Sequence, residues 1–198
     1  MKSFTKLYIP IALETLCYML AGMVDTIMLS TVGDSAVGAV GTANTYINVF
    51  IIMFHVVSSG MIAVMTQYIG AKRIGVAFQA RQLGAVFNMV LGVALSIFLF
   101  VFSGLILEIV GVAPLLMDYA KTYLKIVGGF CFLNALIPIF SSYLRAFGYT
   151  KQPLIATLVA NVVNLCLNAV FLFGLHAGVA GVAVATVLSR ILNLAIVI

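Results

Sequence analysis

Residues 35–69, SAVGAVGTANTYINVFIIMFHVVSSGMIAVMTQYI, decide the fold of this chain because they form an apolar run without a single Asp, Glu, Lys or Arg. A membrane-spanning α-helix needs about 20 consecutive apolar residues to cross a hydrocarbon core about 30 Å thick. The run is longer than that, and its apolar and polar residues do not alternate as they would in a strand. It therefore predicts a membrane-spanning helix that is tilted or projects past the hydrocarbon.

The composition of the whole chain supports this prediction. Of its 198 residues, 64% are hydrophobic and 8% are charged. A soluble domain carries about 25% charged residues, so this chain has too little charge to cover a water-facing surface. We predict an integral, all-α membrane protein whose six apolar segments form a six-helix bundle. The segments run over about residues 7–31, 35–69, 83–110, 115–147, 153–175 and 178–198.

The positions of Lys and Arg predict the orientation of the bundle, because cytoplasmic connectors of membrane proteins are rich in these residues. Basic residues flank the first segment, a polar connector expected over 70–81, and the connector between the fourth and fifth segments; they are Lys2, Lys6, Lys72, Arg73, Arg81, Arg145 and Lys151. Lys121 and Lys125 are exceptions, although Asp118 can pair with Lys121. We expect a cell (plasma or inner) membrane with both termini cytoplasmic, and the net charge of +5 indicates topology rather than nucleic-acid binding.

The chain stops inside apolar sequence, SRILNLAIVI at residues 189–198, with no polar flank. Arg190 is expected near the point where a cytoplasmic connector begins. We therefore expect a cut chain, with more polypeptide after the sixth segment.

Asp25 lies in the middle of the first apolar segment and is the first candidate for function. A charge at the bilayer centre costs about 2.5–3.5 kcal/mol on insertion scales, so intramembrane carboxylates usually carry protons or bind cations. Glu14 lies eleven residues earlier, which returns it to within about 20° of the same helix face, about 16 Å away. The two acids could line one pathway, or Glu14 could be an interfacial acid.

Polar side chains form a stripe on each of the last two segments. On the fifth, Asn161, Asn164 and Asn168 are spaced by three and four residues and share one helix face. The sixth repeats this spacing with Thr186, Ser189 and Asn193. Such groups either bond neighbouring helices or face a wet cavity, and both remain open. Together with Asp25 the two stripes predict a converging ion or proton site.

Other residues favour packing roles. The small-residue ladder Ala177, Gly181, Ala185 and Ser189 suits close helix contacts. The three cysteines, Cys17, Cys131 and Cys166, lie in apolar segments without metal-ligand spacing. His55 is more typical of a satisfied histidine than of a proton relay. The sequence has no nucleophile elbow, phosphate loop or metal-ligand cluster, so we predict no enzyme activity and no cofactor.

Several stretches, taken as a set, resemble the multidrug and toxic compound extrusion (MATE) transporters. They are IPIALETLCYMLAGMVDTIMLSTVG (9–33), AVGAVGTANTY (36–46), VMTQYIGAKR (64–73), YLKIVGGF (123–130), SSYLRAFGYTKQPLIATLVANVVNLCLNAVFLFG (141–174) and GVAGVAVATVLSR (178–190). The resemblance implies two six-helix lobes related by pseudo-twofold symmetry, of which this chain is similar to the amino-terminal one. The missing carboxy-terminal lobe would then be its partner.

The resemblance also implies roles for single residues. Asp25 falls on the proposed coupling residue of bacterial members, joined by Asn164, Asn168 and Thr186, and Pro10 falls where some members are proposed to bend the first helix. Position 168 carries Asn where several members carry Asp. That departure weakens a charge-rich Na⁺ site and makes Asp25 the expected sole charge of the site. A metal site is not expected beyond possible Na⁺ at these four residues.

These observations predict a secondary antiporter that exports cationic or amphipathic drugs and toxic compounds in exchange for H⁺ or Na⁺ by alternating access. One alternative is a lipid-linked oligosaccharide flippase of the same superfamily, although flippases have a more cationic cavity. The other is a non-transporting membrane fragment, because one lobe lacks the surface that alternating access needs.

Overall fold

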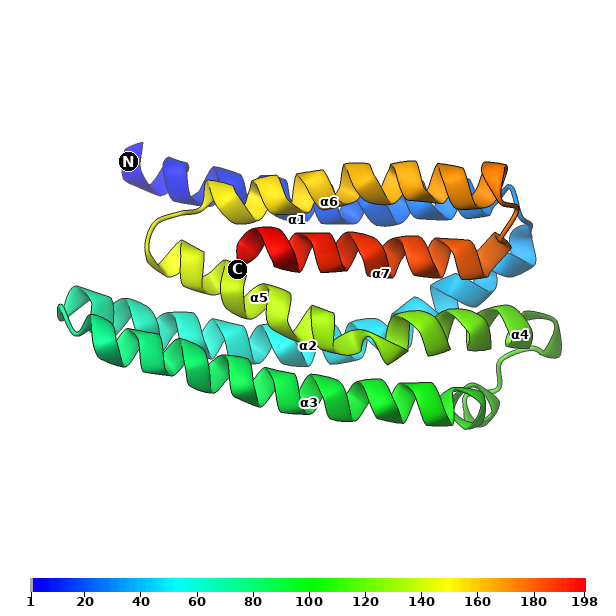
Figure 1. Ribbon diagram of the computed structural model, residues 1–198, viewed down its shortest axis with the longest axis horizontal. Helices are drawn as coiled ribbons and strands as arrows, with labels where there is room; N and C mark the ends of the chain where they lie inside the picture. The colour runs from blue at the N-terminus through cyan, green and yellow to red at the C-terminus, as the bar shows by residue number, and fades with distance from the viewer. Residues whose placement is uncertain (1) are drawn as a thin grey trace.

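The computed structural model describes the backbone of residues 2–198, and the side chains of residues 9–198 other than that of residue 18. Over that range the chain forms a bundle of long helices without strands, in which some neighbouring helices are parallel and others antiparallel (Figure 1). The elements are α1 (Lys2–Leu29), α2 (Asp34–Gly70), α3 (Ile74–Ile109), α4 (Pro114–Tyr123), η1 (Leu124–Gly128), α5 (Cys131–Ala146), α6 (Lys151–Ala169), η2 (Val170–Gly174) and α7 (Gly178–Val197). The predicted all-α bundle is confirmed.

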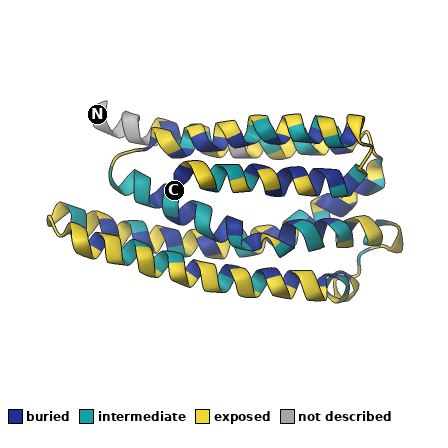
Figure 2. Cartoon of the chain, in the orientation of Figure 1, coloured by how far each residue is buried: buried dark blue, intermediate teal, exposed yellow. Residues whose placement is uncertain are grey.

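The helices are arranged so that α7 lies in the middle of the bundle. It packs against α6 on one side and α5 on the other, while α1 lies beside α6, and α2 and α3 form the opposite side (Figure 1). Buried residues accordingly follow α7 and α5, whereas the outer face of α3 is exposed (Figure 2). The polar stripe of α7 therefore faces protein rather than lipid.

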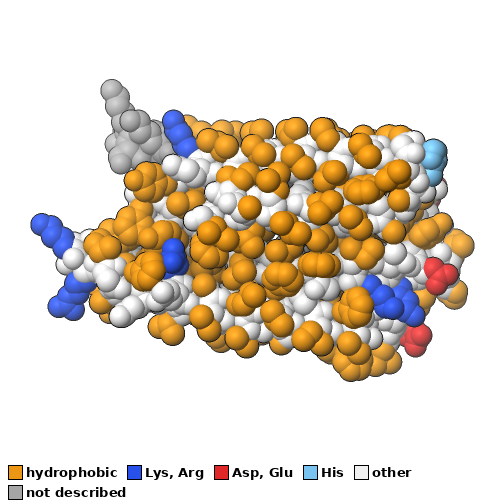
Figure 3. Space-filling model, in the orientation of Figure 1, with side chains coloured by type: hydrophobic (Ala, Val, Ile, Leu, Met, Phe, Trp, Pro, Cys, Tyr) orange, Lys and Arg blue, Asp and Glu red, His pale blue; other side chains and the backbone are white. Residues whose placement is uncertain are grey.

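The surface of the bundle is that of an integral membrane protein. Five described helices are long and apolar enough to cross a membrane, and α4–η1 together with α5 forms a bent sixth span. Hydrophobic side chains cover the flank, and charged side chains gather at the two ends (Figure 3). Three of the five acidic residues of the chain lie near helix ends at the same end of the bundle; they are Asp34, Glu108 and Asp118.

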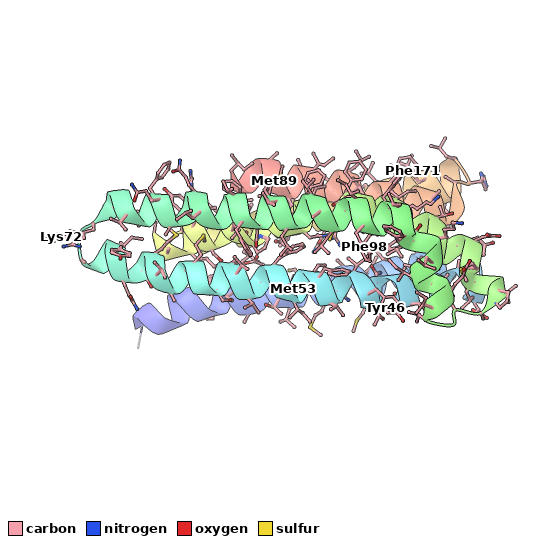
Figure 4. All side chains as sticks on the ribbon, turned by 90° about the horizontal axis from the view of Figure 1, so that it is seen from below. Tyr46, Met53, Lys72, Met89, Phe98 and Phe171 are labelled. Atoms are coloured by element: carbon pink, nitrogen blue, oxygen red, sulfur yellow. The ribbon has the colours of Figure 1, made fainter. Side chains whose placement is uncertain are left out.

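The connector predicted over residues 70–81 is wrong, because α3 already begins at Ile74. The turn is only three residues long, and Lys72 occupies its tip with a positive φ of 59° (Figure 4). Arg81 belongs to α3, where its guanidinium lies 4.5 Å from the ring centroids of both Phe78 and Tyr143. Cation–π contacts of this kind stabilise a charged side chain on a helix. The polar residues up to Arg81 therefore belong to a helix and not to a loop. The side chains of Lys2 and Lys6, counted in the predicted orientation, lie outside the described residues.

The fourth apolar segment, predicted as one helix over 115–147, is broken. The helix axis turns by 45° between η1 and α5, at Gly129 and Phe130. The break leaves backbone amides without their helical partners, and such a group is costly in lipid. The backbone N–H of Phe132 instead donates to the Ser96 Oγ on α3 at 3.0 Å. The neighbouring helix therefore supplies the partner that the broken helix lacks.

A stripe of small and polar residues on α3 receives this break. Asn88, Gly92 and Ser96 are spaced by four residues and are buried. The Asn88 amide nitrogen donates to the Ala135 carbonyl at 2.9 Å, and a Cβ on Gly92 would lie 2.8 Å from the Phe132 Cα. The α3–α5 contact thus requires glycine at position 92, because the backbone opposite leaves no room for a side chain.

Gly92→Ala is expected to destabilise the protein by about 1–3 kcal/mol, since the added methyl must push α5 away from α3. The measurement is the apparent melting temperature of the complete protein purified in detergent. Gly41→Ala is the matched control, because no heavy atom lies within 4 Å of a Cβ built on Gly41 in α2. Equal melting temperatures for the two variants would contradict this account of the packing.

Candidate functional site

Asp25 is joined to the asparagine stripe of α6, as the sequence predicted for a converging site. The Asn168 Nδ2 donates to the Asp25 Oδ1 at 2.6 Å. The same nitrogen lies 3.3 Å from the Asn164 Oδ1, which accepts from it. Asn164 and Asn168 are buried and Asp25 is half-buried. Three of the four proposed coupling residues therefore form one hydrogen-bonded group.

Parallel packing of α1 and α6 creates this group. Nearer the start of both helices, the Asn161 Nδ2 donates to the Cys17 carbonyl at 2.9 Å. The spacing of seven residues on α6 matches that of eight on α1, so both contacts form on one helix seam. Asn161 therefore links α6 to the backbone of α1, while Asn168 links α6 to a titratable side chain of α1.

A cavity of about 200 Å³ opens along this seam. Its walls are mostly apolar, with three polar side chains from the predicted set; the lining residues are Cys17, Leu20, Ala21, Val24, Asp25, Leu158, Asn161, Val162, Asn164 and Leu165. An apolar pocket with a few convergent polar groups is typical of a small-molecule or ion site.

Thr186 turns its hydroxyl to its own helix. The Thr186 Oγ1 donates to the Val182 carbonyl at 2.9 Å, and the Ser189 Oγ donates to the Thr186 carbonyl at 2.8 Å. Asn193 is half-buried, and its Oδ1 has no hydrogen-bond partner among the described residues. The structure therefore brings the α7 stripe into the interior without joining it to Asp25 by a hydrogen bond.

Glu14 lies elsewhere, in an ion pair with Arg145 of α5. The Arg145 Nη2 and the Glu14 Oε2 are 2.6 Å apart, and both side chains are largely shielded. His55 on α2 lies near both charges. Glu14 does not line the cavity beside Asp25, so the structure does not bring the two acids together. The pair links α1 to α5 instead.

Arg190 lies within α7, one helical turn after Thr186. Its expected position near the start of a cytoplasmic connector stays a prediction. Its charge acts on Asp25, on Tyr123 and on Cys131. No hydrogen bond or ion pair among the described side chains joins Arg190 to Asp25, so the expectation that Asp25 is the only charge of the site stays a prediction.

Tyr123 was also missed. It is buried, and its hydroxyl lies near the Asn44 amide of α2 and the Thr186 hydroxyl. Tyr123 and Asn44 sit in stretches where no polar stripe marks the helix, so residue spacing gave no signal for them. Tyr123 directly precedes the π turn η1 that bends the fourth span, and that bend was not predicted from the sequence.

The remaining predictions concern the helix bend at Pro10, the cysteines, the small-residue ladder on α7 and a metal site. Pro10 is buried inside α1, which continues through it as one helix. Cys131 is buried, as a packing role requires, and Cys17 and Cys166 are free thiols. In the ladder on α7, Gly181 and Ala185 are buried, and a Cβ on Gly181 would lie 2.7 Å from the Phe171 Cβ. Over the described side chains, no group of three or more His, Cys, Asp or Glu could hold a metal ion.

Apolar helices around an internal carboxylate–amide cluster define a polytopic membrane protein. The sequence profile of the MatE family matches residues 10–170. The chain belongs to the MatE family, the MATE transporters.

Two curated relatives extend the comparison. The chain is 35% identical to the "Uncharacterized transporter YisQ" of Bacillus subtilis over 189 residues, 93% of this chain and 42% of that protein. It is 31% identical to the "Probable multidrug resistance protein NorM" of Thermotoga maritima over 205 residues, 96% of this chain and 42% of that protein. The chain therefore spans about two-fifths of the length of these relatives.

Solved structures of MATE transporters share the fold. A MOP superfamily transporter from Pyrococcus furiosus superimposes with a TM-score of 0.90 at 21% identity, over 99% of this chain and 43% of that one. A MATE crystal structure in complex with MaL6 gives a TM-score of 0.93 at 21% identity, over 99% and 44%. The chain thus has the fold of one lobe of such a transporter.

Glu14→Gln is expected to lower the stability of the protein by about 1–3 kcal/mol, because it leaves the Arg145 guanidinium shielded without its counter-charge. The apparent melting temperature of the complete protein in detergent measures this. Glu108→Gln is the control, since Glu108 is exposed at the end of α3. If the charge-swapped pair Glu14→Arg with Arg145→Glu were no more stable than Glu14→Gln alone, the ion pair would not be the cause.

Proposed function

We propose that this chain forms the ion-coupling lobe of a secondary antiporter that exports cationic or amphipathic compounds in exchange for H⁺ or Na⁺. The observation that carries the proposal is the Asp25 carboxylate, hydrogen-bonded to Asn168 inside a membrane-spanning bundle and lining a cavity. A carboxylate in a membrane interior is costly, and its usual use is to bind a proton or a cation.

The coupling step acts on the seam between α1 and α6. An ionised Asp25 accepts a charge-assisted hydrogen bond from the Asn168 Nδ2, and such bonds are about twice as strong as neutral ones. Protonation or cation binding neutralises the carboxylate and weakens its hold on α6. The cation thereby favours a different packing of α1, and it can shift the transport cycle only by this difference in affinity between states.

Alternating access needs a second lobe that faces this one across the central site. The curated relatives are more than twice as long as this chain, and transporter folds of this kind work by rocking two repeats around a central site. We propose that this second lobe is a carboxy-terminal lobe of the same protein. The bilayer and small-molecule substrates are then the other partners.

The orientation that we propose places both termini in the cytoplasm of a plasma or bacterial inner membrane. Lys72, Arg73 and Lys151 lie at the end of the bundle opposite to Asp34, Glu108 and Asp118. Positive charges mark the cytoplasmic side of a membrane protein, which supports this assignment.

Efflux is preferred to the flippase alternative on two grounds. A relative that covers almost the whole chain is named a probable multidrug resistance protein. The described residues that line the cavity include the Asp25 carboxylate and no Lys or Arg, whereas flippases have a more cationic cavity.

Asp25→Asn in the complete protein is expected to abolish gradient-driven efflux of a fluorescent cation from reconstituted vesicles, because the amide can neither gain a proton nor bear a charge. Transport is measured under imposed H⁺ and Na⁺ gradients separately. Asp34→Asn, at the exposed start of α2, is the control and is expected to retain transport. Coupled efflux by Asp25→Asn at the wild-type rate would refute the assignment of Asp25.

A further inference from the structure

Two lysines of the fourth span lie apart from the basic residues that set the proposed orientation. Lys121 lies in the last turn of α4 and Lys125 in η1, toward the end of the bundle opposite to the turn at Lys72 (Figure 1). Lys121 is exposed and Lys125 is half-buried. Neither forms an ion pair among the described residues, so the pairing of Lys121 with Asp118 that their spacing allows is not formed. A half-buried ammonium is costly without a counter-charge, and the described part of the chain supplies none to Lys125.

Lys121 reaches across the groove between α4 and α3. A Cβ built on Gly104 of α3 would lie 3.4 Å from both the Cε and the Nζ of Lys121, so the ammonium lies against this glycine. Gly104 follows Phe100 by four residues, about one helical turn. Lys125 precedes Gly129 by the same interval. On both sides of the groove, one helix face therefore runs from the lysines toward the interior of the membrane.

A cavity of about 270 Å³ lies where these two faces lead. Its lining residues are Val93, Ser96, Ile97, Phe100, Gly129 and Phe132. The wall is apolar apart from the Ser96 hydroxyl, which already accepts from the backbone N–H of Phe132. Ile97 and Phe100 are exposed, so the cavity opens on the hydrophobic flank of the bundle (Figure 3). The groove is thus apolar at the depth of the membrane interior and cationic nearer the membrane surface.

The acidic residues at this end lie farther from the membrane interior than the lysines. Glu108 follows Gly104 by one turn toward the end of α3, and Asp118 precedes Lys121 toward the start of α4. Both carboxylates are exposed. An anion held within the membrane surface meets the lysines first, whereas an anion that arrives from water meets the carboxylates. This order of charges favours a lipid headgroup over a dissolved anion.

We propose that Lys121 and Lys125 bind the phosphodiester headgroup of an anionic phospholipid, and that an acyl chain of this lipid occupies the cavity between α3 and the bent fourth span. The inference goes beyond the proposed function and does not depend on it, because it concerns a lipid that stays bound and not a transported compound. In the orientation proposed above, the lipid belongs to the non-cytoplasmic leaflet.

The lysines supply the selectivity of this site. Membrane lipid is as apolar as the cavity wall, so the acyl chain alone distinguishes poorly between one phospholipid and another. Each lysine near the membrane surface attracts an anionic headgroup strongly enough to raise its affinity about fivefold. Lysines at a non-cytoplasmic end also oppose the usual charge bias of membrane proteins. A bound phosphate offsets them, and it gives Lys125 the counter-charge that the chain does not.

The test is a titration of the delipidated complete protein in detergent with phosphatidylglycerol or with phosphatidylcholine, in which bound lipid is counted by native mass spectrometry. We expect the wild type to bind phosphatidylglycerol more tightly. Lys121→Gln combined with Lys125→Gln is expected to weaken phosphatidylglycerol binding by more than about fivefold and to leave phosphatidylcholine binding unchanged. Lys121→Arg combined with Lys125→Arg keeps both charges and is expected to retain the preference.

The matched control is Lys72→Gln combined with Lys151→Gln. It removes the same charge from exposed positions at the opposite end of the bundle. We expect this variant to keep the wild-type affinity for the first phosphatidylglycerol bound.

A second pair of substitutions tests the cavity without changing any charge. Ile97→Trp fills the cavity from its lipid-facing wall and is expected to lose the tightly bound phosphatidylglycerol. Val86→Trp adds the same side chain at an exposed position of α3 outside the cavity and is expected to bind like the wild type. Because both positions are exposed, these variants keep the proposal testable even where a lysine variant does not fold.

Three results would overturn the proposal. One is equal affinity of the wild type for the two lipids. Another is an equal loss of phosphatidylglycerol in the two lysine-to-glutamine double variants, because binding would then follow the total charge and not the groove. The third is an Ile97→Trp variant that binds phosphatidylglycerol like the wild type.

Discussion

Hydrocarbon offers no water to a polar group, and this constraint shapes every irregular feature of the bundle. The bent fourth span exists because Ser96 of the neighbouring helix accepts the amide that the bend exposes at Phe132. The carboxylate of Asp25 is held because Asn168 donates to it. Among the described residues, six leave one buried side-chain atom without a hydrogen-bond partner; they are Asn88, Asn134, Arg145, Asn168, Arg190 and Asn193.

The helices could be predicted because their length and apolar composition can be read directly along the amino-acid sequence. The contact of Asp25 with the asparagine stripe also followed, since a lone carboxylate and a row of amides on one helix face each need partners inside lipid. Helix periodicity gives the face that a residue occupies, and for Asn168 that was sufficient. The family resemblance supplied the expected role of Asp25, and the structure shows which side chain Asp25 contacts.

What could not be predicted depends on how closely the helices approach one another. The break at Gly129 and Phe130 was missed because apolar composition continues through it. Its signal was the pair Gly128–Gly129 facing α3, where a Cβ on Gly128 would lie 3.0 Å from the Leu99 Cβ. Close approach of two helices is a three-dimensional property, and glycine alone does not specify it.

The attachment of α1 bears on where the proposed ion site lies. Among its described side chains only Pro10 and Leu29 are buried, and large side chains such as Leu16, Met23 and Ile27 are exposed. Lipid is as apolar as these side chains, so their contacts give little net attraction between helices. The specific links of α1 are polar: Glu14 to α5, the Cys17 carbonyl to α6, and Asp25 to α6. A helix held mainly by such links changes its packing when one of them changes charge. Asp25 is the link that lines the cavity and can be neutralised by a proton, so in the proposed function α1 is the element through which the ion acts on the rest of the lobe.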